Sequence, residues 1–198
     1  MTGFVQAARR DKLAELVRRG ITPFAYRFER SGTAREALEG FRDGDESVHR
    51  LAGRLGALRS HGKTMFAHVE DASGKIQLYF KRDVLGDDGY EVVQLLDQDD
   101  VIGVSGPLFR TRTGEVTVRV QHLTLLTKSL RPLPRGKEDE HGVLHGALRD
   151  PELRYRERYA DLAVHPEVRQ VFRLRARAVR VMRSFLDRHG YLEVETPV

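Results

Sequence analysis

The sequence predicts a mainly β protein with flanking helices, in which a five-stranded barrel precedes the start of a second, α+β domain. Two observations lead to this fold class. From about Val48 the apolar residues alternate with polar ones, and this period of two recurs in segments until about residue 126. After residue 154 the apolar residues recur at the three- and four-residue steps of a helix, and a segment rich in Pro and Gly separates the two regions.

Residues 1–47 are expected to form a helical extension before the strands. Residues 7–20 read as a helix with Gly20 as its stop, and a shorter helix is expected at about 34–41. The apolar stripe of the first helix consists of Leu13, Leu16 and Val17.

The alternation predicts a domain at 48–128 with five strands and one short helix. The strands are expected at 48–59, 64–70, 75–81, 101–109 and 115–126, with the helix at 91–96. Ala72-Ser73-Gly74 and Thr113-Gly114 supply hairpin turns. Three strands, a helix and two further strands is the element order of the OB-fold, a small barrel that binds oligonucleotides.

The second and third strands have an unusual outer face. Their inward face is apolar and comprises Met65, Ala67, Val69, Ile76, Leu78 and Phe80. The outward face is left with Phe66, His68, Gln77 and Tyr79. Because apolar rings normally lie inside, an outward Phe and Tyr favour a platform on which an unpaired base stacks while an amide reads its edge. Alternatively, the N-terminal helix covers both rings and makes them part of the core.

Charge is segregated within the strand region. Residues 51–128 contain ten Lys or Arg and ten Asp or Glu residues, but seven of the acids lie in 83–100, which has no Lys or Arg. This predicts one positive surface for phosphates and an acidic side that faces away from it. A solvated surface of mixed charge is the simpler alternative.

Composition excludes several kinds of site. The chain has no cysteine, so it has neither disulfides nor thiolate metal ligands. No apolar run approaches the roughly 20 residues of a membrane span, and the start lacks the apolar segment of a signal peptide. We therefore expect a soluble cytoplasmic protein without a membrane partner. His141 and His145 are spaced like a metal pair, but their Gly-rich surroundings favour solvated histidines and no metal site.

Residues 129–153 are expected to be a linker, and residues 154–198 the start of the second domain. A long amphipathic helix is predicted from Pro166 to just before Gly190, followed by a strand at 191–195. A helix and a single strand do not bury their own apolar faces, so we expect this domain to be incomplete in the chain.

The chain resembles the N-terminal part of class II lysyl-tRNA synthetases over nearly its whole length, and five segments carry the resemblance. They are Lys12–Phe24, Gly62–Tyr79, Arg112–Val118, Leu130–Pro134, and the region from RYRERYADL at 154–162 to FLDRHGYLEVETPV at the end. The last resembles motif 1 of class II synthetases, with Pro197 as its proline. The chain departs from the family at Ala25, where many relatives have proline, and at Leu58, where a basic residue is common.

The resemblance implies an enzyme that activates lysine with ATP and Mg²⁺, transfers it to tRNA and works as a homodimer. It implies that 48–128 binds the tRNA anticodon and that 154–198 begins the catalytic domain. The family's ATP- and lysine-binding motifs have no counterpart in this sequence. We therefore assign no catalytic residue, expect no cofactor bound by this chain, and expect the chain alone to be inactive.

The resemblance also assigns binding roles to individual residues. Phe66 would stack on the middle base of the lysine anticodon, and Gln77 would offer uracil one donor and one acceptor. Glu115 would accept a hydrogen bond from a neighbouring anticodon base, and Arg59 and Lys63 would contact phosphate or a base edge. The dimer interface is expected to include the motif 1 residues Val179, Met182, Phe185 and Pro197.

Two other hypotheses remain open. The chain could be the N-terminal region of an aspartyl- or asparaginyl-type synthetase, which shares the barrel and the Phe/Gln pair. It could also be a stand-alone, non-catalytic OB-fold that binds single-stranded nucleic acid.

Overall fold

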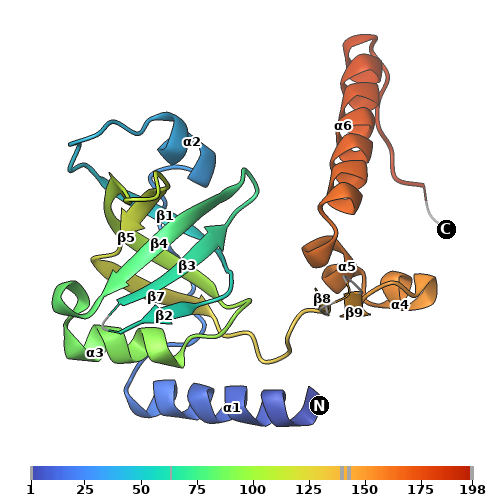
Figure 1. Cartoon of the computed structure of the whole chain (residues 1–198). Coiled ribbons are helices and arrows are strands. Elements are labelled where there is room, and N and C mark those ends of the chain that lie inside the picture. Colours follow the sequence, from blue (N-terminus) through green and yellow to red (C-terminus); the bar gives the residue numbers. More distant parts are fainter. Residues whose placement is uncertain (1, 63, 139–140, 142–143, 197–198) are drawn as a thin grey trace. The chain divides into compact units, whose positions relative to one another are not determined.

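The computed structural model describes all residues except 1, 63, 139–140, 142–143 and 197–198. The chain divides into two units, Met1–Pro132 and Leu133–Val198, and Figure 1 shows the elements of each. Among the residues so described, no helix has the length and apolar character needed to cross a membrane.

The first unit is built on a curved sheet with the strand order β1-β3-β4-β6-β5-β7, with β2 paired to β3 (Figure 1). Its strands are β1 (Val48–Leu55), β2 (Arg59–His61), β3 (Thr64–Glu70), β4 (Lys75–Lys81), β5 (Val101–Arg110), β6 (Val116–Arg119) and β7 (His122–Thr127). β4 and β6 run parallel, whereas the other pairs are antiparallel. β1 also pairs with β5, so the sheet folds back on itself. The OB-fold expected from the element order is confirmed.

The strand expected at 115–126 is wrong in one respect, because the chain divides it into β6 and β7. At the break the N–H of Gln121 donates to the carbonyl of Ser105 over 2.8 Å. The carbonyl of Arg119 approaches Gly106 so closely that a β-carbon there would lie 1.9 Å from the oxygen. The irregularity therefore depends on a glycine in the neighbouring strand β5.

The strands expected at 64–70 and 75–81 are confirmed as β3 and β4. The strand expected at 48–59 is instead divided into β1 and β2. Its continuity is lost where the N–H of Gly56 donates to the carbonyl of His68 over 2.7 Å, which bends the chain before β2 begins.

Three helices belong to the first unit. α1 (Thr2–Arg18) begins earlier than the expected 7–20, and α2 (Ala34–Glu39) matches the shorter helix. α3 (Arg82–Leu95) begins well before the expected 91–96. It is kinked at Gly86, whose φ of 72° is not helical. Because the kink interrupts the helical spacing of apolar residues, the sequence pattern did not predict the part of the helix that precedes it.

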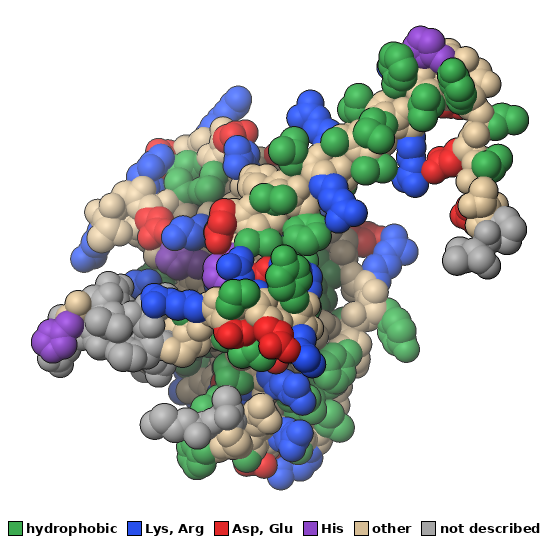
Figure 2. All heavy atoms as spheres, turned by 90° about the vertical axis from the view of Figure 1, so that its right-hand side faces the viewer, with side chains coloured by type: hydrophobic (Ala, Val, Ile, Leu, Met, Phe, Trp, Pro, Cys, Tyr) green, Lys and Arg blue, Asp and Glu red, His purple; other side chains and the backbone are tan. Residues whose placement is uncertain are grey.

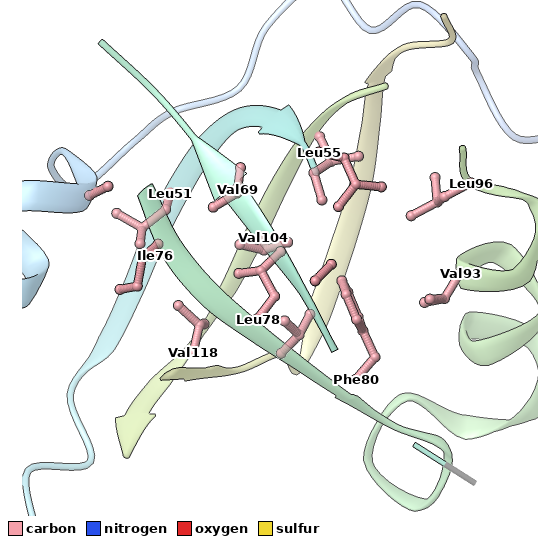
Figure 3. Close-up of a cluster of buried hydrophobic side chains, with 14 of the residues drawn as sticks. Leu51, Leu55, Val69, Ile76, Leu78, Phe80, Val93, Leu96, Val104 and Val118 are labelled. Atoms are coloured by element: carbon pink, nitrogen blue, oxygen red, sulfur yellow. The ribbon is translucent and has the colours of Figure 1, made fainter. Parts of the chain in front are cut away.

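The core of the first unit lies inside the curved sheet. Figure 3 shows Leu78 and Phe80 of β4 among side chains from the other strands, with Val93 and Leu96 at the α3 side. Phe80 and Val93 are fully buried, and Leu16 of α1 belongs to the same cluster. The inward face predicted for the β3–β4 hairpin is therefore the core face, and its opposite face is directed outward.

The acidic side expected from 83–100 is wrong for the end of that segment. Asp100 and Lys128 are both fully buried and lie 2.8 Å apart, and the Lys128 ammonium also lies 2.6 Å from Asp97. Lys12 of α1 binds the other oxygen of Asp97 over 2.7 Å. These carboxylates bind α1 to the sheet instead of facing solvent.

The second unit begins within the segment expected to be a linker. Its elements are β8 (Arg135–Glu138), β9 (Leu144–Ala147), α4 (Pro151–Arg156), α5 (Arg158–Val164) and α6 (Pro166–Arg188). β8 and β9 pair antiparallel. The buried carboxylate of Asp161 accepts from Arg154 over 2.7 Å, contacts His165 over 2.8 Å and also binds Arg158. The charges of the RYRERYADL segment therefore hold α4 and α5 together.

The end of the second unit differs from the prediction. α6 matches the expected helix, but residues 191–196 have no regular secondary structure, so the strand expected at 191–195 is wrong. No strand pairs with this segment among the residues that the structure describes, and a strand without a neighbour leaves its backbone groups unpaired. The apolar stripe of α6 is exposed, with Met182 at 62% and Phe185 at 52%, and green side chains line this helix at the upper right of Figure 2.

Candidate nucleic-acid interface

An aromatic row crosses the outer face of the sheet and ends in an arginine on each side. In the strand register Arg59 lies opposite Phe66, Phe66 opposite Tyr79, and Tyr79 opposite Arg119. Residues directly opposite each other project from the same side of a sheet. Four strands thus contribute to one row, and the Phe and Tyr of the sequence analysis are brought together with Arg59.

The rings of this row contact one another and extend to Phe109 of β5. The centroids of Phe66 and Tyr79 lie 5.0 Å apart, and those of Tyr79 and Phe109 5.6 Å apart. The guanidinium of Arg119 lies 5.3 Å from the centroid of Phe109, a cation–π distance. The three rings form a continuous surface suited to stacking.

A hollow of about 600 Å³ lies over these rings. Its lining consists of Phe66, Tyr79, Lys81, Val84, Phe109, Arg112 and Arg119, which include three cations and no acid. An aromatic floor with a cationic rim fits the two halves of a nucleotide, since bases stack on rings and phosphates bind Lys and Arg.

Helix α1 does not supply the cover that the alternative interpretation requires. The lining of the hollow comes from β3, β4, β5, β6, the start of α3 and the loop before β6. α1 packs elsewhere, with Leu16 in the core and Arg9 donating to the carbonyls of Gln98 and Ser129. Phe66 and Tyr79 are partly buried by each other while the hollow beside them stays open.

A polar row runs beside the aromatic one. His68 lies opposite Gln77, and Gln77 opposite Thr117. The Gln77 amide nitrogen donates to Oε2 of Glu115 over 2.7 Å, and its amide oxygen accepts from Oγ1 of Thr117 over 2.7 Å. His68 Nε2 lies 2.9 Å from Oε1 of Glu115. Gln77 and Glu115, which the sequence analysis assigned to different bases, are therefore hydrogen-bonded to each other.

The structure places the other candidate residues as follows. Arg59 is exposed beside Phe66, whereas Lys63 and Pro197 lie outside the described residues. Val179, Met182 and Phe185 are on α6, in the second unit. His141 is exposed, and within the described ranges no three or more His, Cys, Asp or Glu residues gather as metal ligands.

Thr117, Phe109 and Arg119 were missed by the sequence analysis. The signal for two of them was available, because an inward Val118 forces its neighbours Thr117 and Arg119 to point outward on the same strand. Alternation with the buried Leu108 also directs Phe109 outward, but its contact with Tyr79 depends on how β5 and β6 pair and has no local signal.

Comparison with known proteins gives two family matches. Residues 49–126 match the OB-fold nucleic acid binding domain, and residues 150–198 match the tRNA synthetases class II (D, K and N).

Three similar curated proteins carry the name lysine–tRNA ligase. The chain is 50% identical to the protein of Carboxydothermus hydrogenoformans over 96% of this chain and 37% of that protein. It is 49% identical to that of Moorella thermoacetica over 98% of this chain and 38% of that protein. It is 48% identical to that of Pelotomaculum thermopropionicum over 96% of this chain and 36% of that protein. The chain thus spans little more than a third of the length of these relatives.

Proposed function

Since the chain belongs to the class II lysyl-tRNA synthetase family, we propose that it recognises the anticodon loop of lysine tRNA as part of an enzyme that attaches lysine to that tRNA. The observation that carries the proposal is the outer face of the sheet, where an aromatic row with arginines at both ends lies beside an amide held by hydrogen bonds. Unpaired RNA bases are recognised by this combination of stacking and edge reading.

Each residue has a distinct role in this proposal. Phe66 stacks on the middle base, which enters the hollow beside Tyr79, and Gln77 reads its pairing edge. Glu115 keeps acceptor capacity beyond its contacts with His68 and Gln77, because a carboxylate has about four lone-pair sites, and it accepts from a base N–H. Arg59 and Lys63 bind backbone phosphate or a base edge.

The proposal extends to the rest of the chain. Residues 1–47 form the helical extension, 48–128 the anticodon-binding domain, 129–153 the linker, and 154–198 the start of the catalytic domain. The apolar side of α6, where Met182 and Phe185 are exposed and Val179 is half-buried, contributes with Pro197 to a homodimer of the enzyme, which works in the cytoplasm with its tRNA.

ATP and Mg²⁺ belong to the reaction of the family, in which ATP supplies the energy that activates lysine. In the part of the chain that the structure describes, no group of three or more His, Cys, Asp or Glu residues is arranged to hold a metal ion. We derive no step of the chemistry from the residues of this chain.

The experiment measures the affinity of the 198-residue chain for a stem-loop with the lysine anticodon and for loops with a changed middle base. Phe66→Ala should weaken binding to all loops by about 1–3 kcal/mol, the usual worth of one stacked base. Gln77→Ala should instead reduce the preference for uracil. Phe24→Ala, which removes an exposed ring outside the hollow, is the control. Equal affinity of the parent chain for all loops would contradict the proposal.

Loops with the aspartate and asparagine anticodons test the second candidate. The class II family model covers the aspartate, lysine and asparagine enzymes together. By the genetic code, the anticodons of all three amino acids have uracil as the middle base. The three loops differ only at the anticodon bases that flank the middle uracil. A preference for the lysine loop would therefore show that the chain also reads those flanking bases, and it would support lysine tRNA as the substrate.

A further inference from the structure

The amide of Gln77 is held in one orientation. An ionised carboxylate only accepts hydrogen bonds, so the NH₂ group of Gln77 must face Glu115, 2.7 Å away. The amide oxygen then faces the hydroxyl of Thr117, also 2.7 Å away, and that hydroxyl acts as the donor. Turning the amide by 180° would place oxygen against oxygen at Glu115 and would leave the Thr117 hydroxyl only its longer contact with the Glu115 carbonyl as an acceptor.

Thr117 is placed to hold the amide without touching RNA. Its side chain is fully buried, and its position in β6 lies opposite Gln77 in the parallel register with β4. The carbonyl of Glu115 is its other acceptor, at the longer distance of 3.2 Å. Since water does not reach this hydroxyl, no solvent molecule replaces it when it is removed.

The orientation of the amide matters because uracil and cytosine present opposite patterns. Uracil has a donor at N3 beside an acceptor at C4, whereas cytosine has an acceptor at N3 beside an amino donor at C4. An amide fixed in one orientation matches one of the two patterns, and the same amide turned by 180° matches the other. A freely turning amide would accept both bases.

We propose that Thr117 is a positioning residue that fixes the order of donor and acceptor on Gln77 and thereby sets the preference for uracil over cytosine at the middle base. The proposal rests on the proposed function, and it assigns to Thr117 an effect on discrimination and not on overall affinity. Glu115 holds the other end of the same amide, with His68 on its second oxygen.

The test compares Thr117→Val with the parent chain on four stem-loops that carry uracil, cytosine, adenine or guanine at the middle position. Valine keeps the shape of threonine and removes the hydroxyl. The uracil-over-cytosine preference should fall about fivefold, the worth of one hydrogen bond, while affinity for the uracil loop stays within about twofold of the parent. Thr117→Ser should keep the parent preference, as should Thr124→Val, which changes an exposed threonine of β7.

A second variant tests the same route through Glu115. In Glu115→Gln the new amide either donates or accepts, so it no longer fixes the Gln77 amide, and cytosine should again gain relative to uracil. Thermal unfolding of each variant checks that the sheet is intact.

The outcomes separate this inference from the function on which it rests. If Thr117→Val keeps the parent preference, or loses affinity equally for all four loops, the positioning role of Thr117 is wrong while anticodon recognition stands. If the parent chain itself does not distinguish uracil from cytosine, both are wrong.

Discussion

Arg59 stands at the end of the aromatic row, exposed and opposite Phe66, where a phosphate flanking a stacked base would pass. Arg59→Gln should weaken binding to matched and mismatched loops alike, and should lower the slope of log affinity against log salt by about one unit, because one phosphate contact no longer releases a counterion. Titrations at several salt concentrations measure both effects.

Arg10→Gln on α1 is the matched control for Arg59, since it removes an exposed arginine of a helix that does not line the hollow. An unchanged salt slope in Arg59→Gln, or an equal change in both variants, would contradict phosphate binding at Arg59. The same comparison separates a local contact from the general effect of a lower net charge.

Individual residues were predictable where alternation alone decides the side of the sheet. Phe66 and Gln77 face outward because Ala67, Ile76 and Leu78 are buried, and this needs no knowledge of other strands. The hydrogen bond between Gln77 and Glu115 was not predictable, because Glu115 lies in a loop whose position depends on how β4 and β6 pair in parallel.

At the scale of elements, the buried pair of Lys128 with Asp100, joined by Asp97, fixes α1 to the sheet through Lys12. Lys128→Met should reduce the free energy of unfolding by about 3–5 kcal/mol, because it leaves a buried carboxylate without its partner. Urea unfolding measures this. Lys75→Met, on an exposed lysine of β4, should change it by no more than about 0.5 kcal/mol.

The same cluster predicts a dependence on pH. Burial raises the pKa of Asp97, but hydrogen bonds from Lys12 and Lys128 outweigh it, and the pKa lies below its usual value. A carboxyl whose pKa is lowered by folding stabilises the protein above its unfolded pKa of about 3.9, and this contribution is lost as the pH falls through the folded pKa. Asp97→Asn should therefore lower the free energy of unfolding at neutral pH. The free energy of unfolding of this variant should also change less with pH in the acid range.

Urea unfolding between pH 3 and 7 checks this, with Asp88→Asn on an exposed aspartate as the control. Parallel pH curves for the parent and Asp97→Asn would contradict the assignment.

Elements were predictable where local pattern and turn suffice. β3 and β4 were predicted at their observed bounds, since a Ser-Gly turn joins two alternating strands. The division of 115–126 was not predictable, because it depends on the close approach of Arg119 to Gly106 in another strand. The early start of α3 was hidden by Gly86, whose conformation interrupts the helical period.

At the scale of the whole molecule, the two units differ in how far they bury their apolar residues. The first unit encloses a continuous core, whereas α6 leaves Val171, Met182 and Phe185 between 52% and 65% exposed. Burying one such side chain stabilises a protein by about 1.5–3 kcal/mol. Contact between the exposed stripe and a second copy of the chain would therefore lower the free energy.

We therefore predict that the 198-residue chain associates as its concentration rises, and that Met182→Glu together with Phe185→Glu shifts this association to higher concentration. Light scattering over a concentration series measures the change. Arg180→Glu on the same helix is the matched control, because it alters charge outside the apolar stripe.

A chain ending at Arg149 should stay monomeric and keep its affinity for the anticodon loop, because every described residue of the hollow and of the Gln77 network precedes that point. A parent chain that is monomeric at all concentrations would show that the exposed face of α6 does not bind a second copy.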